Sequence, residues 1–213
     1  MERYFLYGCG GIGCELADYL SSRERADIIF IDDNDSLKTV YGFPVLSLRE
    51  ALDRYPLPEV GVTVTVGEPA VREAISARLG ELCVPEKTID LSAYHSTSTV
   101  TIAPGTILHI SSVMTVRTEI GRSCLINKGA VIGHDCRIGD HCVISPNVTV
   151  GGGVVIGSGC FIGSGAVIRN NVTIGAETII GMGAVVTKDV ESEVVLVGNP
   201  GRVLRKNETR RVF

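Results

Sequence analysis

The stretch IGDHCV-ISPNVT-VGGGVV-IGSGCF, residues 138–161, repeats one six-residue pattern four times. Each hexad begins with Ile or Val and carries a small residue or Val four positions later, such as Cys142 after Ile138. A bulky aliphatic residue occupies the first position of fifteen successive hexads, from Ile102 to Val186. A period of six is neither the helical period of 3.6 nor the strand period of 2, and it predicts a solenoid of stacked coils. With three hexads in each coil, residues 102–191 would form about five coils.

Composition places the 213-residue chain among globular proteins, with 45% hydrophobic and 21% charged residues. Its formal net charge of −4 gives no general attraction to nucleic acid or to an anionic membrane. No run approaches the ~18 consecutive apolar residues of a transmembrane helix, and the N-terminus lacks the regions of a signal peptide. We therefore expect a cytoplasmic protein with no membrane insertion and no nucleic-acid partner.

Seven cysteines raise the question of disulfides or a metal site. Four of them fall on the small, interior position of the hexads: Cys124, Cys136, Cys142 and Cys160. A zinc site needs ligands that converge on a tetrahedron, and residues stacked in a column at that position do not converge. The pattern favours small, buried, reduced core residues and no metal.

Residues 1–93 carry a different pattern, in which short apolar strands alternate with helical segments. We expect strands at 3–7, 27–31, 60–66 and 88–91, and helices at 12–20, 47–55 and 69–79. This order predicts an α/β domain, a small Rossmann-like parallel sheet with helices packed on it. The predicted organisation is this domain at 1–93, a linker at 94–101, the solenoid at 102–191 and a basic tail at 192–213 that caps the last coil.

A glycine-rich turn follows the first predicted strand. Gly8, Gly10 and Gly13 match the dinucleotide fingerprint G-x-G-x-x-G, and Asp32 stands nineteen residues after Gly13, where a ribose-binding acid belongs. The N–H groups at the start of the following helix can hold a diphosphate. Alone, the motif indicates NAD, although the domain has about half the length of a full dinucleotide fold.

His134 is the strongest candidate for catalysis. It occupies the third position of its hexad, which lies at a turn and outside the interior, so packing does not explain an imidazole there. An imidazole titrates near neutrality and can take a proton from an attacking amine. Asp135 follows on the same turn and could accept a hydrogen bond from the ring, which would make it a stronger base. The alternative from position alone is an exposed His–Asp pair without a role.

The hexads, as in Ile138-Gly139-Asp140-His141-Cys142-Val143, resemble the left-handed parallel β-helix of the hexapeptide acyltransferase superfamily. A narrower resemblance covers nearly the whole chain, through Tyr7-Gly8-x-Gly-Gly, Phe30-Ile31-Asp32-Asp33, Gly133-His134-Asp135-Cys136 and Val197-Gly198-Asn199-Pro200. In these motifs the chain is similar to the nucleotide-sugar acetyltransferases. That family includes the N-acetyltransferases of UDP-4-amino-sugars on the bacillosamine pathway, the perosamine N-acetyltransferases and the sialic acid O-acetyltransferase-like proteins.

This resemblance implies an acetyl-CoA-dependent N-acetyltransferase, with His134 as the general base and Asp135 as its acidic neighbour. Acetyl-CoA would lie in a groove between subunits of a homotrimer, with Gly152, Ser164 and Met182 at the matching contact positions. The family places a second histidine nine residues after the base, touching the acetyl end of the cofactor. Here that position holds Val143, which puts the acetyl-positioning contact in question.

The resemblance also implies that the first domain binds the nucleotide part of a nucleotide-activated amino sugar, of the UDP type. The matching substrate-binding positions are Gly10, Gly11 and Ile12 in the loop, Asp32 and Asp33 after the second strand, Gly67 after the third, and Asn127 in the acceptor pocket. Ile12 stands where the family usually carries histidine, so one polar contact to the nucleotide is missing.

Three alternatives stay open at this point. The acceptor could be a hydroxyl, as in the sialic acid O-acetyltransferase-like group. The replacements at Val143 and Ile12 could belong to a non-catalytic protein that binds nucleotide sugars. A zinc hydratase of the carbonic anhydrase type shares the β-helix, but it needs three converging histidines, and the spacing of His109, His134 and His141 does not match that group.

Overall fold

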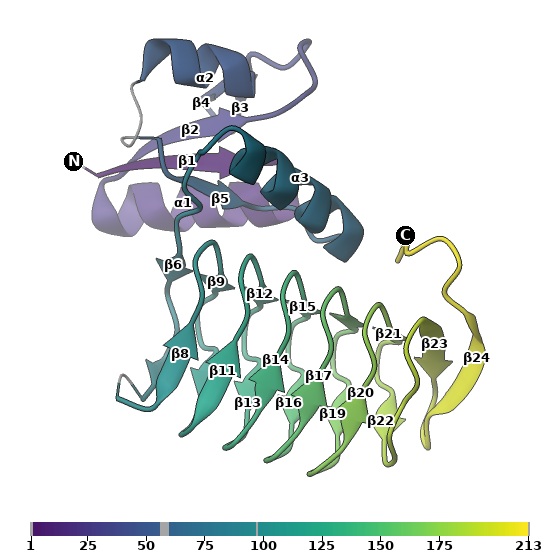
Figure 1. Cartoon of the computed structure of the whole chain (residues 1–213). Helices are drawn as coiled ribbons and strands as arrows, with labels where there is room; N and C mark the ends of the chain where they lie inside the picture. The colour runs from purple at the N-terminus through teal and green to yellow at the C-terminus, as the bar shows by residue number, and fades with distance from the viewer. Residues whose placement is uncertain (1, 56–59, 97, 213) are drawn as a thin grey trace. The chain divides into compact units, whose positions relative to one another are not determined.

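The computed structural model describes residues 2–55, 60–96 and 98–212. It divides into two compact units, each of which is described by itself (Figure 1). The first comprises Met1–Gly67 and Ala74–Lys87, and the second comprises Glu68–Glu73 and Thr88–Phe213. In the described residues, no helix is both long enough and apolar enough to cross a bilayer.

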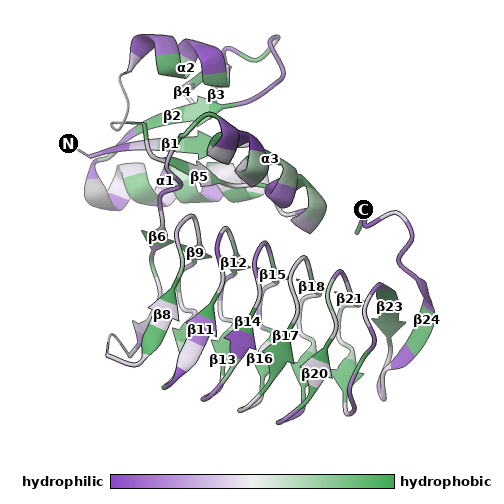
Figure 2. Cartoon of the chain, in the orientation of Figure 1, coloured by the Kyte–Doolittle hydropathy of each residue, from purple (hydrophilic) through white to green (hydrophobic). Residues whose placement is uncertain are grey.

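The first unit is built on a five-stranded sheet with the strand order β3-β4-β2-β1-β5. Its strands are β1 (Arg3–Tyr7), β2 (Asp27–Ile31), β3 (Thr39–Val40), β4 (Phe43–Leu46) and β5 (Val62–Val64). Its helices are α1 (Gly11–Glu24), α2 (Leu48–Arg54) and the greater part of α3 (Pro69–Glu81). β4, β2, β1 and β5 run parallel, while β3 pairs antiparallel with β4. The core residues of β2 are buried, and the strand is mostly green, that is hydrophobic, in Figure 2.

The structure of this unit differs from the sequence prediction in two places. The hairpin of β3 and β4 was not expected, because its short strands carry no clear alternation of apolar and polar residues. The strand expected at 88–91 does not join the N-terminal sheet. It forms β6 (Ile89–Asp90), which pairs parallel with β9 of the second unit, and Ile89 N–H donates to the carbonyl of Thr106 at 3.1 Å.

The second unit is a parallel β-helix with three sheets, formed by short strands that recur along the coils (Figure 1). The six-stranded sheet holds β7 (Tyr94–His95), β10 (Val113–Met114), β13 (Val131–Ile132), β16 (Thr149–Val150), β19 (Val167–Ile168) and β22 (Val185–Val186). The five-stranded sheet holds β8 (Val100–Ile102), β11 (Thr118–Ile120), β14 (Arg137–Ile138), β17 (Val155–Ile156) and β20 (Thr173–Ile174). The eight-stranded sheet holds β6, β9 (Ile107–Leu108), β12 (Leu125–Ile126), β15 (Val143–Ile144), β18 (Phe161–Ile162), β21 (Ile179–Ile180), β23 (Val194–Val197) and the antiparallel β24 (Arg202–Lys206).

Pairing places residues eighteen apart in neighbouring coils, as in Val131 with Thr149 and Thr149 with Val167. The aliphatic first positions of the hexads form the interior of the β-helix. Of these residues, only Ile102, near the N-terminal end of the β-helix (the open end below), is partly exposed. The expected linker residues include β7 and β8, which belong to the first coil. In that coil Asp90 pairs with Leu108 and His95 with Met114, so polar residues replace the aliphatic ones at the open end and the period is lost there.

The cysteines of the hexads are buried and unpaired, as the repeat predicts. Each thiol donates to the carbonyl of a glycine fifteen residues later, for example Cys142 Sγ to Gly157 at 3.1 Å and Cys124 Sγ to Gly139 at 3.1 Å. Thr118 repeats the arrangement with its hydroxyl, which donates to the carbonyl of Gly133 at 3.0 Å. These side chains therefore satisfy backbone carbonyls of the coils.

Candidate functional site

The first candidate site is the turn between β13 and β14, residues 133–135, termed the histidine turn below. Asp135 adopts a left-handed backbone with φ 59° and donates its N–H to the carbonyl of Val116 at 3.0 Å. From the next coil, Gly153 N–H donates to the carbonyl of His134 at 2.7 Å. The His134 side chain is 58% exposed. The backbone of the turn is therefore held on both sides, while the imidazole points outside the β-helix interior.

The imidazole of His134 lies against the backbone of Gly152, which occupies the equivalent turn one coil later. A Cβ atom at Gly152 would stand 2.5 Å from both Nε2 and Cε1 of the ring. Real Cβ contacts are almost never shorter than 3.0 Å. Any other residue at 152 would displace the ring, so glycine there gives His134 its position.

A carboxylate and a guanidinium orient the same ring. His134 Nδ1 lies 2.6 Å from Asp135 Oδ2, and Arg117 donates to both oxygens of Asp135, from Nε at 2.6 Å and from Nη2 at 2.9 Å. The hydrogen bonds from Arg117, and next that from His134, hold the pKa of Asp135 well below its ordinary value. Since the carboxylate is ionised, it accepts a hydrogen bond from Nδ1–H of His134, which leaves Nε2 as the nitrogen that can take a proton.

The predicted contact residues lie on two different corners of the prism. The histidine turn and Gly152 lie where the six-stranded sheet passes into the five-stranded one, between β13 and β14 and between β16 and β17. Ser164 lies between β18 and β19, and Met182, which is 80% exposed, between β21 and β22. One chain thus brings His134, Asp135 and Gly152 together and places Ser164 and Met182 where the eight-stranded sheet passes into the six-stranded one.

The second candidate site is the glycine loop between β1 and α1. Gly8 has φ 116°, and a Cβ at Gly13 would stand 2.3 Å from the carbonyl oxygen of Gly8, so both positions require glycine. Among the described residues, nothing lies within 4 Å of the places where a Cβ of Gly10 or Gly11 would stand. The start of α1 is therefore open to a ligand, and its N–H groups suit a diphosphate. Ile12 reaches from this loop to Gly67: its Cδ1 would lie 3.1 Å from a Cβ there.

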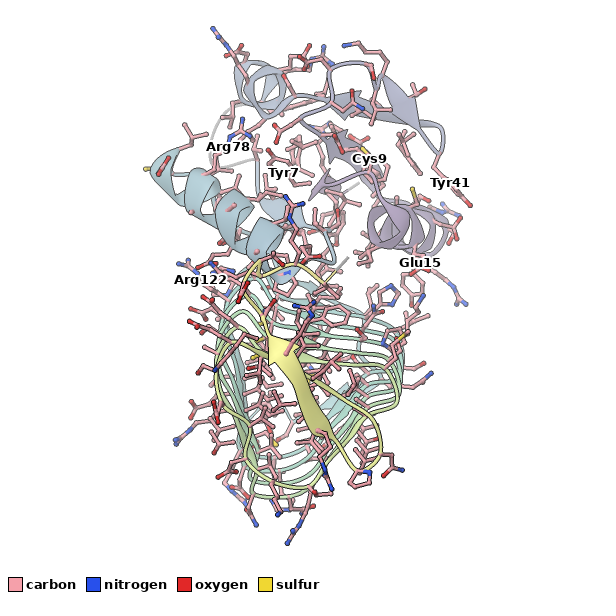
Figure 3. The ribbon with its side chains drawn as sticks, turned by 90° about the vertical axis from the view of Figure 1, so that its right-hand side faces the viewer. Tyr7, Cys9, Glu15, Tyr41, Arg78 and Arg122 are labelled. Atoms are coloured by element: carbon pink, nitrogen blue, oxygen red, sulfur yellow. The ribbon has the colours of Figure 1, made fainter. Side chains whose placement is uncertain are left out.

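The two acids that follow β2 have different partners. Asp32 accepts hydrogen bonds from Cys9 N–H at 3.2 Å and Asn34 N–H at 3.0 Å. Asp33 accepts from Tyr7 Oη at 2.8 Å and from Arg78 Nη1 at 2.8 Å. Figure 3 shows Tyr7 and Arg78 close to each other, and Arg78 Nη1 also donates to Tyr7 Oη at 2.7 Å. The Asp33 carboxylate is thus used to join β1, β2 and α3.

The surroundings of Asp33, Tyr7 and Cys9 shift the pKa of each side chain. Burial raises the pKa of Asp33, but the hydrogen bonds from Arg78 and Tyr7 outweigh it, and the pKa lies below the ordinary value. Burial, with a further contribution from Asp33, raises the pKa of the Tyr7 hydroxyl. Burial, and next the charge of Asp32, raises the pKa of the Cys9 thiol to about 12. Cys9 is therefore a protonated thiol in the loop rather than a nucleophile.

Comparison with known proteins identifies the family to which the chain belongs. Residues 117–152 and 153–188 match the model for the bacterial transferase hexapeptide (six repeats), and residues 3–79 match the PglD N-terminal domain. WeeI from Acinetobacter baumannii AYE is 31% identical, with a TM-score of 0.82 over 95% of this chain and 100% of that one. The chain belongs to the nucleotide-sugar acetyltransferases of the hexapeptide-repeat superfamily. The predicted family and fold class, including the left-handed β-helix, are confirmed.

Other solved structures are also similar to this acetyltransferase. PerB from Caulobacter crescentus, in complex with CoA and GDP-perosamine, is 28% identical, with a TM-score of 0.79 over 94% of this chain and 96% of that one. The acetyltransferase domain of PglB from Neisseria gonorrhoeae FA1090 is 25% identical, with a TM-score of 0.51 over 96% of this chain and 100% of that one. No curated protein matches the chain.

Two of the predicted side chains of this acetyltransferase, those of Val143 and Asn127, are buried. Val143 on β15 is 2% exposed and pairs with Leu125 and Phe161. Asn127 is 9% exposed, and its Oδ1 accepts the N–H of Lys128 at 2.8 Å, which closes the turn after β12. A contact of Val143 with the cofactor and of Asn127 with the acceptor stays a prediction. His141 lies in the turn before β15, with φ 58°.

Sequence reasoning missed three residues that orient the candidate sites: Arg117, Tyr7 and Arg78. Arg117 stands eighteen residues before Asp135, and this coil spacing could have paired them. The contact of Arg78 with Asp33 joins α3 to the end of β2 and carries no local signal. Among the described residues, no group of three or more His, Cys, Asp or Glu side chains is placed to hold a metal ion.

Proposed function

We propose that this acetyltransferase transfers the acetyl group of acetyl-CoA to the amino group of a nucleotide-activated amino sugar. The observation that carries the proposal is the histidine turn, in which Arg117, Asp135 and Gly152 fix one exposed imidazole. The open space at Gly10 and Gly11 in the glycine loop of the first unit supports the proposal that the substrate carries a nucleotide. PerB, which is similar over nearly the whole chain, is described in complex with CoA and GDP-perosamine.

In the proposed reaction the amine attacks the thioester carbonyl directly, and a C–N bond forms. Nε2 of His134 takes the amine proton, because Nδ1–H is donated to Asp135. The tetrahedral intermediate collapses with cleavage of the C–S bond, and the imidazolium returns the proton to the departing sulfur. No covalent intermediate on the enzyme is needed, and the ionised Asp135 stabilises the imidazolium that forms.

For the nucleotide, we assign Gly10, Gly11 and Ile12 to the diphosphate loop and Gly67 to its rim. Asp32 is assigned to the ribose or the base. Since Tyr7 and Arg78 occupy the carboxylate of Asp33, Asp33 supports the shape of this site. The base stays open among uracil, guanine and thymine.

The proposed assembly is a homotrimer in the cytoplasm. The outward residues of the six-stranded sheet form a column beside the histidine turn that is apolar except for Thr149: Tyr94, Val113, Val131, Thr149, Val167 and Val185. Tyr94, Val131 and Val167 are 57%, 40% and 42% exposed in the single chain, as expected for a surface that a second copy covers. A neighbouring copy would bring Ser164 and Met182 to the acetyl-CoA that lies at His134.

The test is an acetyl-transfer assay with UDP-, GDP- and dTDP-linked amino sugars, each compared with its hydroxyl analogue. Thiol release from acetyl-CoA is followed, and the product is analysed by mass spectrometry. We expect turnover with an amino sugar of one nucleotide class and an alkali-resistant amide product. An alkali-labile ester would indicate O-acetylation, and binding of a nucleotide sugar without any binding of acetyl-CoA would contradict the proposal.

A further inference from the structure

The chain that follows β24, residues 207–212, is called the terminal segment below, and it is held on the β-helix by side chains. Asn207 is 5% exposed, and its Nδ2 donates to the carbonyl of Glu177 at 2.7 Å. Arg210 forms two ion pairs, one from Nε to Oε2 of Glu177 at 3.0 Å and one with Glu73. The terminal segment is therefore fixed at Glu177 and reaches from there to Glu73.

Glu73 belongs to a short stretch at the start of α3, Glu68–Glu73, which is part of the second unit. Arg72 in this stretch is completely buried. Its Nε donates to the carbonyl of Ser123 at 2.7 Å, and its Nη2 donates to the carbonyl of Cys124 at 3.2 Å. Since a buried guanidinium that loses such partners carries a large desolvation penalty, Arg72 fixes the stretch on a turn of the β-helix.

Glu68, the first residue of this stretch, carries a carboxylate next in sequence to the proposed nucleotide site. It directly follows Gly67, which lies against Ile12 of the glycine loop. A carboxylate at that position opposes a diphosphate, because like charges repel. Glu68 is half-buried, and its Oε1 accepts the N–H of Val212 at 2.8 Å. The terminal segment thus contacts the one group of this stretch that would disfavour the substrate.

We propose that the terminal segment holds the Glu68 carboxylate away from the diphosphate of the nucleotide sugar. This inference rests on the proposed function. The Val212 N–H fixes one carboxylate oxygen, and the ion pairs of Arg210 hold the segment that supplies this N–H. Without them the Glu68 side chain can change rotamer, and its charge then raises the free energy of the bound diphosphate. The terminal segment is a positioning element for nucleotide binding and takes no part in the acetyl transfer itself.

The experiment removes the hydrogen bond and the charge separately, in the whole chain. Val212→Pro removes the donor without changing any charge, because proline has no N–H, and Val212→Ala is the matched control that keeps it. Glu68→Gln removes the charge, and the double variant Glu68→Gln/Val212→Pro shows whether that charge makes the loss of the N–H harmful. Titration calorimetry gives Kd for UDP, GDP, dTDP and acetyl-CoA.

Val212→Pro should bind about tenfold more weakly to the nucleoside diphosphate that the wild type prefers. Val212→Ala should match the wild type. The double variant should also bind like the wild type, since a neutral amide does not repel the diphosphate. Kd for acetyl-CoA and kcat with both substrates saturating should stay unchanged. A double variant as weak as Val212→Pro would overturn the inference, and so would an equal loss of acetyl-CoA binding.

Arg210→Ala gives a second test if Val212→Pro does not fold. Arg211→Ala is its control, because it removes the same charge from the next residue, whose side chain is exposed. Arg210→Ala should raise KM for the nucleotide sugar about fivefold at unchanged kcat, and adding Glu68→Gln should remove the effect. A lower melting temperature with unchanged KM would overturn the inference, because the ion pairs would then only stabilise the fold. If the wild type binds none of the three nucleoside diphosphates, the proposed function itself fails.

Discussion

Gly152→Ala is the sharpest test of how His134 is positioned. The added Cβ would stand 2.5 Å from Nε2 and Cε1 of the imidazole, about 0.9 Å inside an ordinary contact of 3.4 Å. The backbone at Gly152 does not have a left-handed φ, so alanine fits the turn itself. The exposed ring, rather than the coil, must move.

A displacement of about 1 Å at a reacting group can cost about 10²-fold in rate. We therefore expect kcat of Gly152→Ala to fall by about two orders of magnitude in the thiol-release assay, with a melting temperature close to that of the wild type. Gly80→Ala is the control, because no atom of the residues that the structure describes lies within 4 Å of a Cβ there. It should keep full activity and gain about 0.5–1 kcal/mol of stability from its helical position.

Combining Gly152→Ala with His134→Ala distinguishes displacement of the ring from general damage to the coil. In a His134→Ala background no ring is left to displace, so adding Gly152→Ala should cost little further activity and little stability. A Gly152→Ala protein with kcat within threefold of the wild type would show that the ring is not displaced, and a melting temperature that falls equally in both backgrounds would indicate general damage to the coil.

The remaining predictions concern the groups around the two candidate sites. Asp135→Asn should lower kcat about 10²-fold or more, because the amide cannot hold the Nδ1 proton and stabilise the imidazolium as a carboxylate does; steady-state kinetics measures it. The pKa of Asp135 is lower in the folded than in the unfolded protein. Asp135 therefore stabilises the fold at a pH above its unfolded-state pKa, and this stabilisation is lost as the pH falls through its folded-state pKa. The stability of Asp135→Asn, measured by acid unfolding, should depend less steeply on pH than that of the wild type. Arg117→Met should lower kcat about tenfold, and Arg117→Lys should recover part of the loss, since one of the two hydrogen bonds to Asp135 can re-form; equal rates in both variants would contradict this. Tyr7→Phe should cost about 1 kcal/mol of stability by denaturant unfolding, because the Tyr7 hydroxyl joins Asp33 and Arg78, and it should raise KM for the nucleotide sugar with little change in kcat.

The β-helix could be predicted because its determinants are local. Each hexad closes its own turn and supplies one interior aliphatic residue, so the period alone locates the core and places His134 outside it. The first coil escaped prediction because its interior positions hold Asp90 and His95 near the open end. There a polar side chain costs little, since Asp90 keeps 38% and His95 17% of its side chain exposed.

The candidate sites were predictable in part. The glycine loop and the histidine turn follow from motifs, because special backbone and exposed turn positions restrict the residue types. The groups that orient them depend on tertiary contacts between distant segments, as between Arg78 and Asp33, forty-five residues apart. Sequence spacing alone also could not show that the ring of His134 lies on Gly152, since this depends on the direction of the side chain.

We assign His134 as the base that takes the amine proton. The most direct measurement is single-turnover acetyl transfer by His134→Ala, with acetyl-CoA and the amino-sugar nucleotide both shown by calorimetry to be bound. We expect transfer to fall by about 10²–10⁴-fold while both ligands still bind and the oligomeric state is unchanged. Transfer at the rate of the wild type from the fully bound complex would contradict it.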